Sequence, residues 1–256
     1  MLASPASVDF RDLLVAKVAG EESVAQELCI GLTWTACKTA TTIGLAMSPT
    51  ERSRTLQWPG TLVGKKAADL AAWIGSWNSF EASVGLSAIN AVVNAPGNAL
   101  MGQAQPLAIG NLSVFEHFRP QLVGKRVGVV GRYPGLARVL NGLDVRVLER
   151  MPGEEDLPDT SAEYVLPECD WVFLTATSLI NKTFPRLAEL SRRSVTVLMG
   201  PSCPWLSEWR EFGIDIVAGV QVIDPTKTWQ VVLEGGGTRL FDEGVRYAVA
   251  DLRTSR

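Results

Sequence analysis

Small polar side chains and glycines gather where the predicted strands of the second half of the chain end. An apolar run at 125–130 leads straight into Gly131, and three later apolar runs end in a similar way. Because the carboxyl ends of parallel strands meet at one edge of a sheet, these residues are expected to share one crevice. Their hydroxyl, amide and carboxylate groups suit hydrogen bonds to a small organic molecule. The candidate ligand-binding residues at these ends are Gly131, Arg132, Tyr133, Glu149, Thr175, Thr177, Asn181, Gly200 and Ser202.

The turn that begins at Gly131 predicts a Rossmann-like unit without a dinucleotide cofactor. The apolar run at 127–130 indicates a buried parallel strand, and residues 136–140 predict the helix that follows it. The fingerprint G-x-G-x-x-G is absent, because the registers that start at Gly128 and at Gly131 both fail to match it. The Arg-Tyr-Pro sequence at 132–134 fills the turn where a pyrophosphate needs open backbone amides. Binding of NAD or NADP is therefore not expected.

Two of the strand-end groups have a second interpretation. Glu149 lies where Rossmann folds place an acid that holds ribose hydroxyls, but it is equally well an exposed carboxylate beside Arg150. Ser178 or Asn181 could cap the helix that follows and bond its free amides. Ligand contact is compatible with such a cap, because a helix N-terminus also favours an anion.

The segment 200–204, Gly-Pro-Ser-Cys-Pro, predicts a stiff turn after a buried strand. It presents Ser202 and Cys203 at its tip. A catalytic thiol would need a nearby cationic group to lower its pKa, and His117 is the single histidine of the sequence. The sequence favours a structural turn over a reactive Cys203.

Composition excludes several classes of protein. The 256 residues carry a net charge of −3, with 46% hydrophobic and 20% charged residues, and no basic patch stands out, so nucleic acid is not an expected partner. No apolar run has the length of a membrane span, and the N-terminus lacks a signal-peptide pattern. The four cysteines show no close pairing, which favours reduced thiols and a cytoplasmic location. They are Cys29, Cys37, Cys169 and Cys203.

The first part of the chain predicts a small α+β domain that ends near residue 112. The pattern indicates a helix at 9–19, two strand-like runs at 27–36 and 41–46, and helices at 62–73 and 81–93. A connector at 98–111 follows, so the domain boundaries are predicted at 1–112 and 113–256.

The second part alternates strands with helices, which predicts an α/β domain with a parallel sheet wound by right-handed crossovers. The expected strands are 125–130, 144–148, 171–175, 194–199 and 214–218. The expected helices are 135–141, 183–190, 205–211 and 225–233.

Polar residues also line one face of the predicted helix 81–93. Ser83, Asn90 and Asn94 are spaced by seven and four residues, so they share that face. This stripe fits a ligand-facing surface or a polar interface with the second domain, and the sequence leaves both open. Glu81 and Asn90 complete the candidate ligand-binding residues.

Several long motifs resemble a known family, the one called putative heavy-metal chelation, a domain of unknown function. The resemblance covers nearly the whole chain and implies an enolase-N-terminal-like domain followed by a Rossmann-like domain, with a ligand site between them. It also implies a role in heavy-metal chelation or in the metabolism of a metal chelator. Cys203 departs from the family pattern, in which a hydroxyl residue follows the glycine-proline-serine turn. The motifs that carry the resemblance are 81–91, 175–190, 197–204, 212–219 and 222–225.

Direct chelation by the protein needs grouped thiolates, imidazoles or carboxylates. One histidine and four scattered cysteines provide no such group at local spacing, so no metal ligands are assigned. The favoured hypothesis is a protein that binds or modifies a small molecule or a metal chelate. A non-catalytic carrier of a metal chelate and a Rossmann-type transferase or oxidoreductase with an atypical glycine loop stay open. Whether the protein is an enzyme, which cofactor it uses and whether it forms a homodimer stay open as well.

Overall fold

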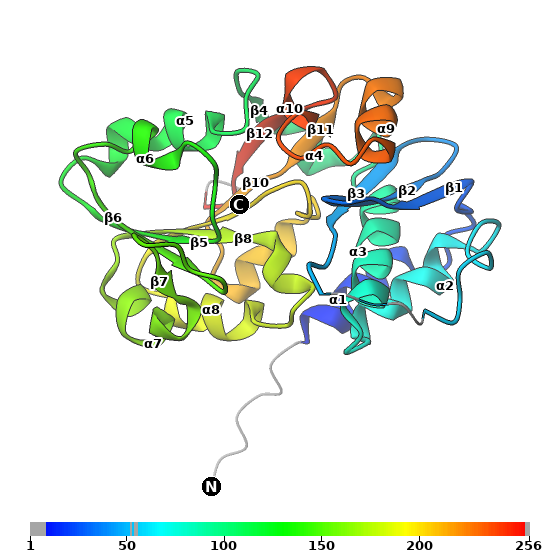
Figure 1. Ribbon diagram of the computed structural model, residues 1–256, viewed down its shortest axis with the longest axis horizontal. Coiled ribbons are helices and arrows are strands. Elements are labelled where there is room, and N and C mark those ends of the chain that lie inside the picture. The colour runs from blue at the N-terminus through cyan, green and yellow to red at the C-terminus, as the bar shows by residue number, and fades with distance from the viewer. Residues whose placement is uncertain (1–8, 52, 54–55, 254–256) are drawn as a thin grey trace, which may run out of the picture.

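The structure is a computed structural model that describes residues 9–51, 53 and 56–253. Its first part is a three-stranded antiparallel sheet covered on one side by helices (Figure 1). The strands are β1 (Glu27–Ile30), β2 (Trp34–Lys38) and β3 (Ile43–Met47). The helices are α1 (Phe10–Val18), α2 (Ala67–Ala71), the 3-10 turn η1 (Ala72–Gly75) and α3 (Ser79–Val93).

Two predicted elements of this part are shorter than expected, and backbone hydrogen bonds explain both. The run at 27–36 is two strands, because Gly31 N–H bonds Trp34 O and turns the chain between β1 and β2. The helix expected at 62–73 begins only at Ala67. The residues before this helix are held by backbone hydrogen bonds to Ala25. Ala25 N donates to Lys65 O, and Gly64 N donates to Ala25 O.

The second part contains a mostly parallel sheet with the strand order β11-β12-β10-β9-β8-β5-β6-β7. Strands β10, β9, β8, β5, β6 and β7 run parallel, and β12 is antiparallel to β10, to β11 and to the short β4. The strands are β4 (Gln105–Pro106), β5 (Arg126–Val130), β6 (Asp144–Glu149), β7 (Leu157–Pro158), β8 (Trp171–Thr175), β9 (Val195–Met199), β10 (Ile216–Ala218), β11 (Val220–Val222) and β12 (Val245–Asp251). The predicted fold class, a small α+β part followed by an α/β part with a parallel sheet, is confirmed.

Helices cover both faces of the main sheet, as in a doubly wound fold (Figure 1). One face carries α5 (Ser113–Leu122) and α6 (Leu136–Val139), and the other carries α7 (Ala162–Val165) and α8 (Phe184–Leu190). The remaining elements are α4 (Ala99–Gln103), η2 (Asp159–Ser161), η3 (Leu166–Glu168), η4 (Ala176–Leu179), η5 (Ser207–Phe212), α9 (Pro225–Leu233) and α10 (Leu240–Glu243).

The two parts share a hydrophobic core, and a C-terminal segment of the second part packs against the first. The ring of Phe10 in α1 lies 5.6 Å from that of Phe184 in α8, so one buried cluster continues from one part into the other. Helix α9 crosses back to pack against β2, and Trp34 Nε1 donates a hydrogen bond to Gly237 O. The segment from α9 to α10 therefore lies beside the first sheet, although it follows the predicted boundary by more than a hundred residues (Figure 1). No helix within the described residues is long and apolar enough to cross a membrane.

Candidate functional site

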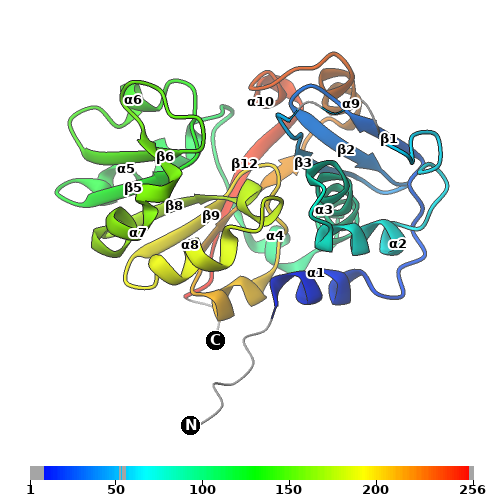
Figure 2. The ribbon, with the colours of Figure 1, turned by 60° about the horizontal axis from the view of Figure 1, so that its bottom comes forward.

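A cavity of about 1040 Å³ lies between the carboxyl edge of the main sheet and the first part of the chain. Figure 2 shows the antiparallel sheet with α3 on one side and the main sheet on the other. The cavity is lined by the ends of β5, β6, β8 and β9, by residues 47–51 from the end of β3 onward, and by 237–239 before α10. Nine of the predicted residues line it: Gly131, Arg132, Tyr133, Glu149, Thr175, Thr177, Asn181, Gly200 and Ser202.

The glycine turn after β5 packs closely against the end of β8. Gly131 has a φ of +100°, and a Cβ atom at this position would lie 3.3 Å from the side chain of Thr175. The next side chain, Arg132, forms an ion pair with Asp156. The amide of Gly153 and this guanidinium both bind Asp156 and lower the pKa of its carboxyl.

Glu149 binds the backbone of two strand-end loops. Its Oε2 accepts a hydrogen bond from Arg132 N at 2.8 Å, and its Oε1 accepts one from Arg150 N at 2.8 Å. The carboxylate therefore links these two loops, and its remaining acceptor sites leave both interpretations of the sequence, an exposed carboxylate and a ribose acceptor, as predictions.

Tyr133 presents a buried hydroxyl at the cavity. Its ring packs edge-on against Phe115, with centroids 5.0 Å apart. The hydroxyl oxygen is buried and makes no hydrogen bond of ordinary geometry among the described residues, although the Thr175 side chain acts on it and lowers its pKa against the effect of burial. Burial raises the pKa of Tyr133 and that of the neighbouring Tyr247, so both phenols stay protonated at neutral pH.

The end of β8 leaves two hydrogen-bond donors unused. Thr175 accepts from Thr177 N at 3.3 Å and donates its own proton to Thr177 Oγ1 at 3.2 Å, which leaves the Thr177 proton free to donate. Asn181 Oδ1 accepts from both the amide and the hydroxyl of Thr183, at 3.1 and 2.7 Å. These two donors fix the orientation of the Asn181 amide. Its Nδ2 has no partner in the part of the chain that the structure describes.

The polar face of α3 holds the turn at 200–204. Asn90 Nδ2 donates to Leu45 O at 2.7 Å and to Ser202 O at 3.1 Å. Asn94 Nδ2 donates to Cys203 O at 3.1 Å, and Asn94 Oδ1 accepts from Trp205 N at 2.9 Å. Because these are contacts between two parts of the protein, the face has the geometry of an internal interface.

The remaining predicted residues divide between the cavity and the packing around it. Ser202 lines the cavity, but its Oγ accepts from Met47 N at 2.9 Å and so fixes the end of β3. Asn90 is fully buried and is absent from the cavity lining, as is Glu81. Glu81 accepts from Trp58 Nε1 and Ser76 Oγ, both in the first part. Its carboxylate therefore links the first turn of α3 to the segments that contain Trp58 and Ser76.

Sequence reasoning missed the cavity residues that come from distant segments. They include Thr33 and Ser48 from the first sheet and Thr238 and Tyr247 from the C-terminal region. Only Tyr247 had a local signal, because residues 245–251 contain β-branched and aromatic residues of the kind that favour a strand.

None of the four cysteines forms a disulfide, and the described residues contain no group of three or more His, Cys, Asp or Glu side chains that could hold a metal ion. Burial raises the pKa of Cys37 from 9.0 to about 12 and that of Cys169 to about 11. Burial also raises the pKa of Cys203, whose Sγ lies 3.7 Å from two backbone carbonyl oxygens. Cys203 is thus a structural thiol.

We expect only Cys29 to react with a thiol reagent such as Ellman's reagent in the folded protein at pH 8, because it alone is partly exposed. The other three should react after denaturation. Because their folded pKa values exceed the unfolded 9.0, the stability that they contribute is complete below pH 9 and is lost as the pH rises toward 11 and 12. Rapid labelling of two or more thiols without unfolding would contradict this burial.

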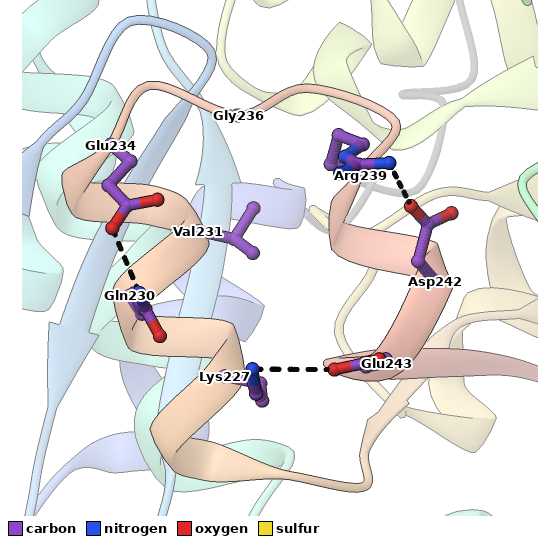
Figure 3. Close-up of a pocket in the computed structure, with 8 residues that line it drawn as sticks. All are labelled: Lys227, Gln230, Val231, Glu234, Gly236, Arg239, Asp242 and Glu243. Carbon is purple, nitrogen blue, oxygen red and sulfur yellow. Dashed lines mark hydrogen bonds and ion pairs between the residues drawn. The ribbon is translucent and has the colours of Figure 1, made fainter.

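A second, smaller groove of about 470 Å³ lies between α9 and α10. Figure 3 shows that its charged side chains mostly bind one another, with Lys227 close to Glu243 and Arg239 close to Asp242. Since these charges are already paired, the groove offers less to a ligand than the larger cavity.

The fold defines a Rossmann-like α/β protein that carries a small α+β part beside the carboxyl edge of its sheet. Two family models, each described as "Putative heavy-metal chelation", match residues 113–251 (DUF364) and residues 12–93 (DUF4213). The first match covers more than half of the chain, so the protein belongs to this family.

Similar proteins share this fold along their length. A crystal structure of a DUF364-family protein of unknown function from Desulfitobacterium hafniense is 30% identical, with a TM-score of 0.80, and the match covers 94% of this chain and 97% of that one. A second such structure, from Pyrococcus horikoshii, is 18% identical with a TM-score of 0.74 and the same coverage, and it shows the fold alone. An uncharacterized protein of Methanocaldococcus jannaschii is 25% identical over 70% of this chain and 69% of its own length.

Proposed function

We propose that the protein binds a small organic metal ligand, free or already carrying its metal ion, in the cavity at the carboxyl edge of the main sheet. The observation that carries the proposal is the pair of unused donors, the Thr177 hydroxyl and the Asn181 amide, on the wall of a cavity of about 1040 Å³. Small-molecule sites are usually concave, of similar size, and fitted with a few placed polar groups.

The chemistry of the cavity favours oxygen acceptors on the ligand. Metal-binding organic molecules present carboxylate, hydroxyl or similar oxygens, and such oxygens accept hydrogen bonds from hydroxyl and amide donors.

The residues do not fit direct chelation of a bare metal ion. A protein site for a soft or borderline metal needs several converging thiolates or imidazoles. Among the described residues no such group exists, and three of the four thiols are buried with raised pKa values. The family description is therefore best reconciled with this chain if the metal is cargo that enters as part of a chelate.

Native mass spectrometry combined with metal analysis tests the proposal on protein purified without added chelators. We expect any retained metal to accompany an organic mass, and Cys29→Ser and His117→Ala to leave its amount unchanged. If no ligand co-purifies, citrate and its nickel and iron(III) complexes serve as calorimetric probes. Stoichiometric metal without an organic mass, lost in either variant, would make the protein itself the chelator.

A further inference from the structure

The Glu149 carboxylate accepts a hydrogen bond from Arg132 N, the first backbone amide after Gly131 in the glycine turn. In such folds the backbone amides after the first strand point at the anion, and the pyrophosphate lies beside them. Here the amides of Arg132 and Arg150 point at the Glu149 carboxylate, each at 2.8 Å. One carboxylate thus uses both amides, one from each of two adjacent strand-end loops.

The register of the sheet explains this placement. Strands β5 and β6 are parallel, with Val130 opposite Leu148, and Gly131 N–H bonds Leu148 O. The ladder therefore extends one step past the last strand pair, and Glu149 follows at once beside the glycine turn. A side chain of two methylene groups suffices to reach both amides from there.

The cation nearest to the turn is also engaged. Arg132 would attract a phosphate, but its guanidinium forms an ion pair with Asp156, which also accepts from Gly153 N at 2.9 Å. The loop at 153–156 thereby pairs the positive charge of Arg132. The two amides and the Arg132 cation are therefore used within the protein, whereas the guanidinium of Arg150, which also lines the cavity, has no ion-pair partner among the described residues.

We infer that Glu149 is a built-in anion that fills the phosphate position of the glycine turn and so excludes nucleotides and other phosphate ligands from the cavity. The inference narrows the ligand class of the proposed site and rests on that proposal for its biological meaning. The ligand then approaches from the Thr177 and Asn181 side and carries its acceptor oxygens on groups other than phosphate.

The test uses Glu149→Ala and Glu149→Ser, with inorganic pyrophosphate and ATP as probes in calorimetry. We expect no binding to the wild type at about 1 mM and a dissociation constant at or below about 1 mM in both variants, because each frees two amides. Glu51→Ala is the matched control, since Glu51 lines the same cavity but bonds only Ser79 Oγ, at 3.0 Å, among the described residues. The Glu51→Ala variant should bind neither pyrophosphate nor ATP.

Circular dichroism first establishes that the variants are folded, and folded variants that bind neither probe overturn the inference. A second measurement needs no variant. In the wild type, the Arg132 and Arg150 amides should be protected from hydrogen exchange, and their NMR signals should not move when pyrophosphate is added. Unprotected amides, or signals that shift with pyrophosphate, overturn the inference as well. Neither result depends on which organic ligand the cavity holds, so the proposed function succeeds or fails separately.

Discussion

Replacing Gly44 with alanine is expected to destabilise the protein by more than about 3 kcal/mol, because the new methyl group has no room. Gly44 is the second residue of β3 and lies where the backbone of α3 comes into contact with the strand. A Cβ atom there would lie 2.1 Å from both Ala91 N and Ser87 O, which are main-chain atoms that cannot rotate away. Helix and strand would have to separate. Urea unfolding followed by circular dichroism measures the loss.

Gly75→Ala is the matched control for this change. Gly75 ends η1 at an ordinary φ, and an added Cβ would meet nothing within 4 Å. Its stability should stay within about 0.5 kcal/mol of the wild type. A Gly44→Ala protein with the same unfolding midpoint as Gly75→Ala would show that α3 and β3 are not in backbone contact.

The Gly44 contact also sets one wall of the cavity. Strand β3 ends at Met47, whose amide bonds Ser202 Oγ, and residues 47–51 then line the cavity. A separation of α3 from β3 would shift this segment relative to the turn at 200–204. Gly44→Ala is therefore expected to weaken ligand binding as well, even in the fraction of molecules that stays folded.

The elements that were predicted most accurately are those whose sequence patterns depend only on neighbouring residues. Strand β8 agrees residue for residue with the predicted 171–175, because five consecutive apolar or β-branched residues suit a strand buried on both faces. Helix α9 also agrees with the predicted 225–233. Asp224 caps it by accepting from Lys227 N, and Pro225 occupies its first turn, where the missing N–H costs nothing.

Elements that depend on distant partners were missed or misjudged. Strand β12 was not predicted, and it exists because β10, β11 and β4 supply its hydrogen bonds from both sides. The helix predicted at 205–211 is the 3-10 segment η5, which begins only at Ser207. Asn94 and Asn98, more than a hundred residues earlier in the chain, hold the backbone of Trp205 just before it.

The same distinction applies to the candidate site. Strand ends could be found from the sequence, because a parallel sheet brings its carboxyl ends together whatever the side chains are. The sequence could not show which polar side chains are left without hydrogen bonds inside the protein. The spacing of Asn90 and Asn94 identifies one face of a helix, but the segment that covers this face lies at 202–205. Only the folded chain shows that the amide nitrogens of both side chains already donate hydrogen bonds.

Asn181→Asp is expected to weaken ligand binding about 10- to 100-fold while leaving the fold intact. The aspartate keeps the Oδ1 atom that accepts from the amide and hydroxyl of Thr183, so the turn before α8 retains its hydrogen bonds. It replaces the free Nδ2 donor with a negatively charged oxygen. A ligand that presents carboxylate oxygens then meets repulsion where it met a hydrogen bond.

Asn141→Asp is the control with the same change in charge, because Asn141 is exposed and does not line the cavity. The measurement compares the amount of co-purified ligand by native mass spectrometry and the affinity for metal–citrate probes by calorimetry. The melting temperatures of the wild type and both variants should agree. If Asn181→Asp binds as tightly as Asn141→Asp, the ligand does not contact this amide, and the end of β8 is not the recognition surface.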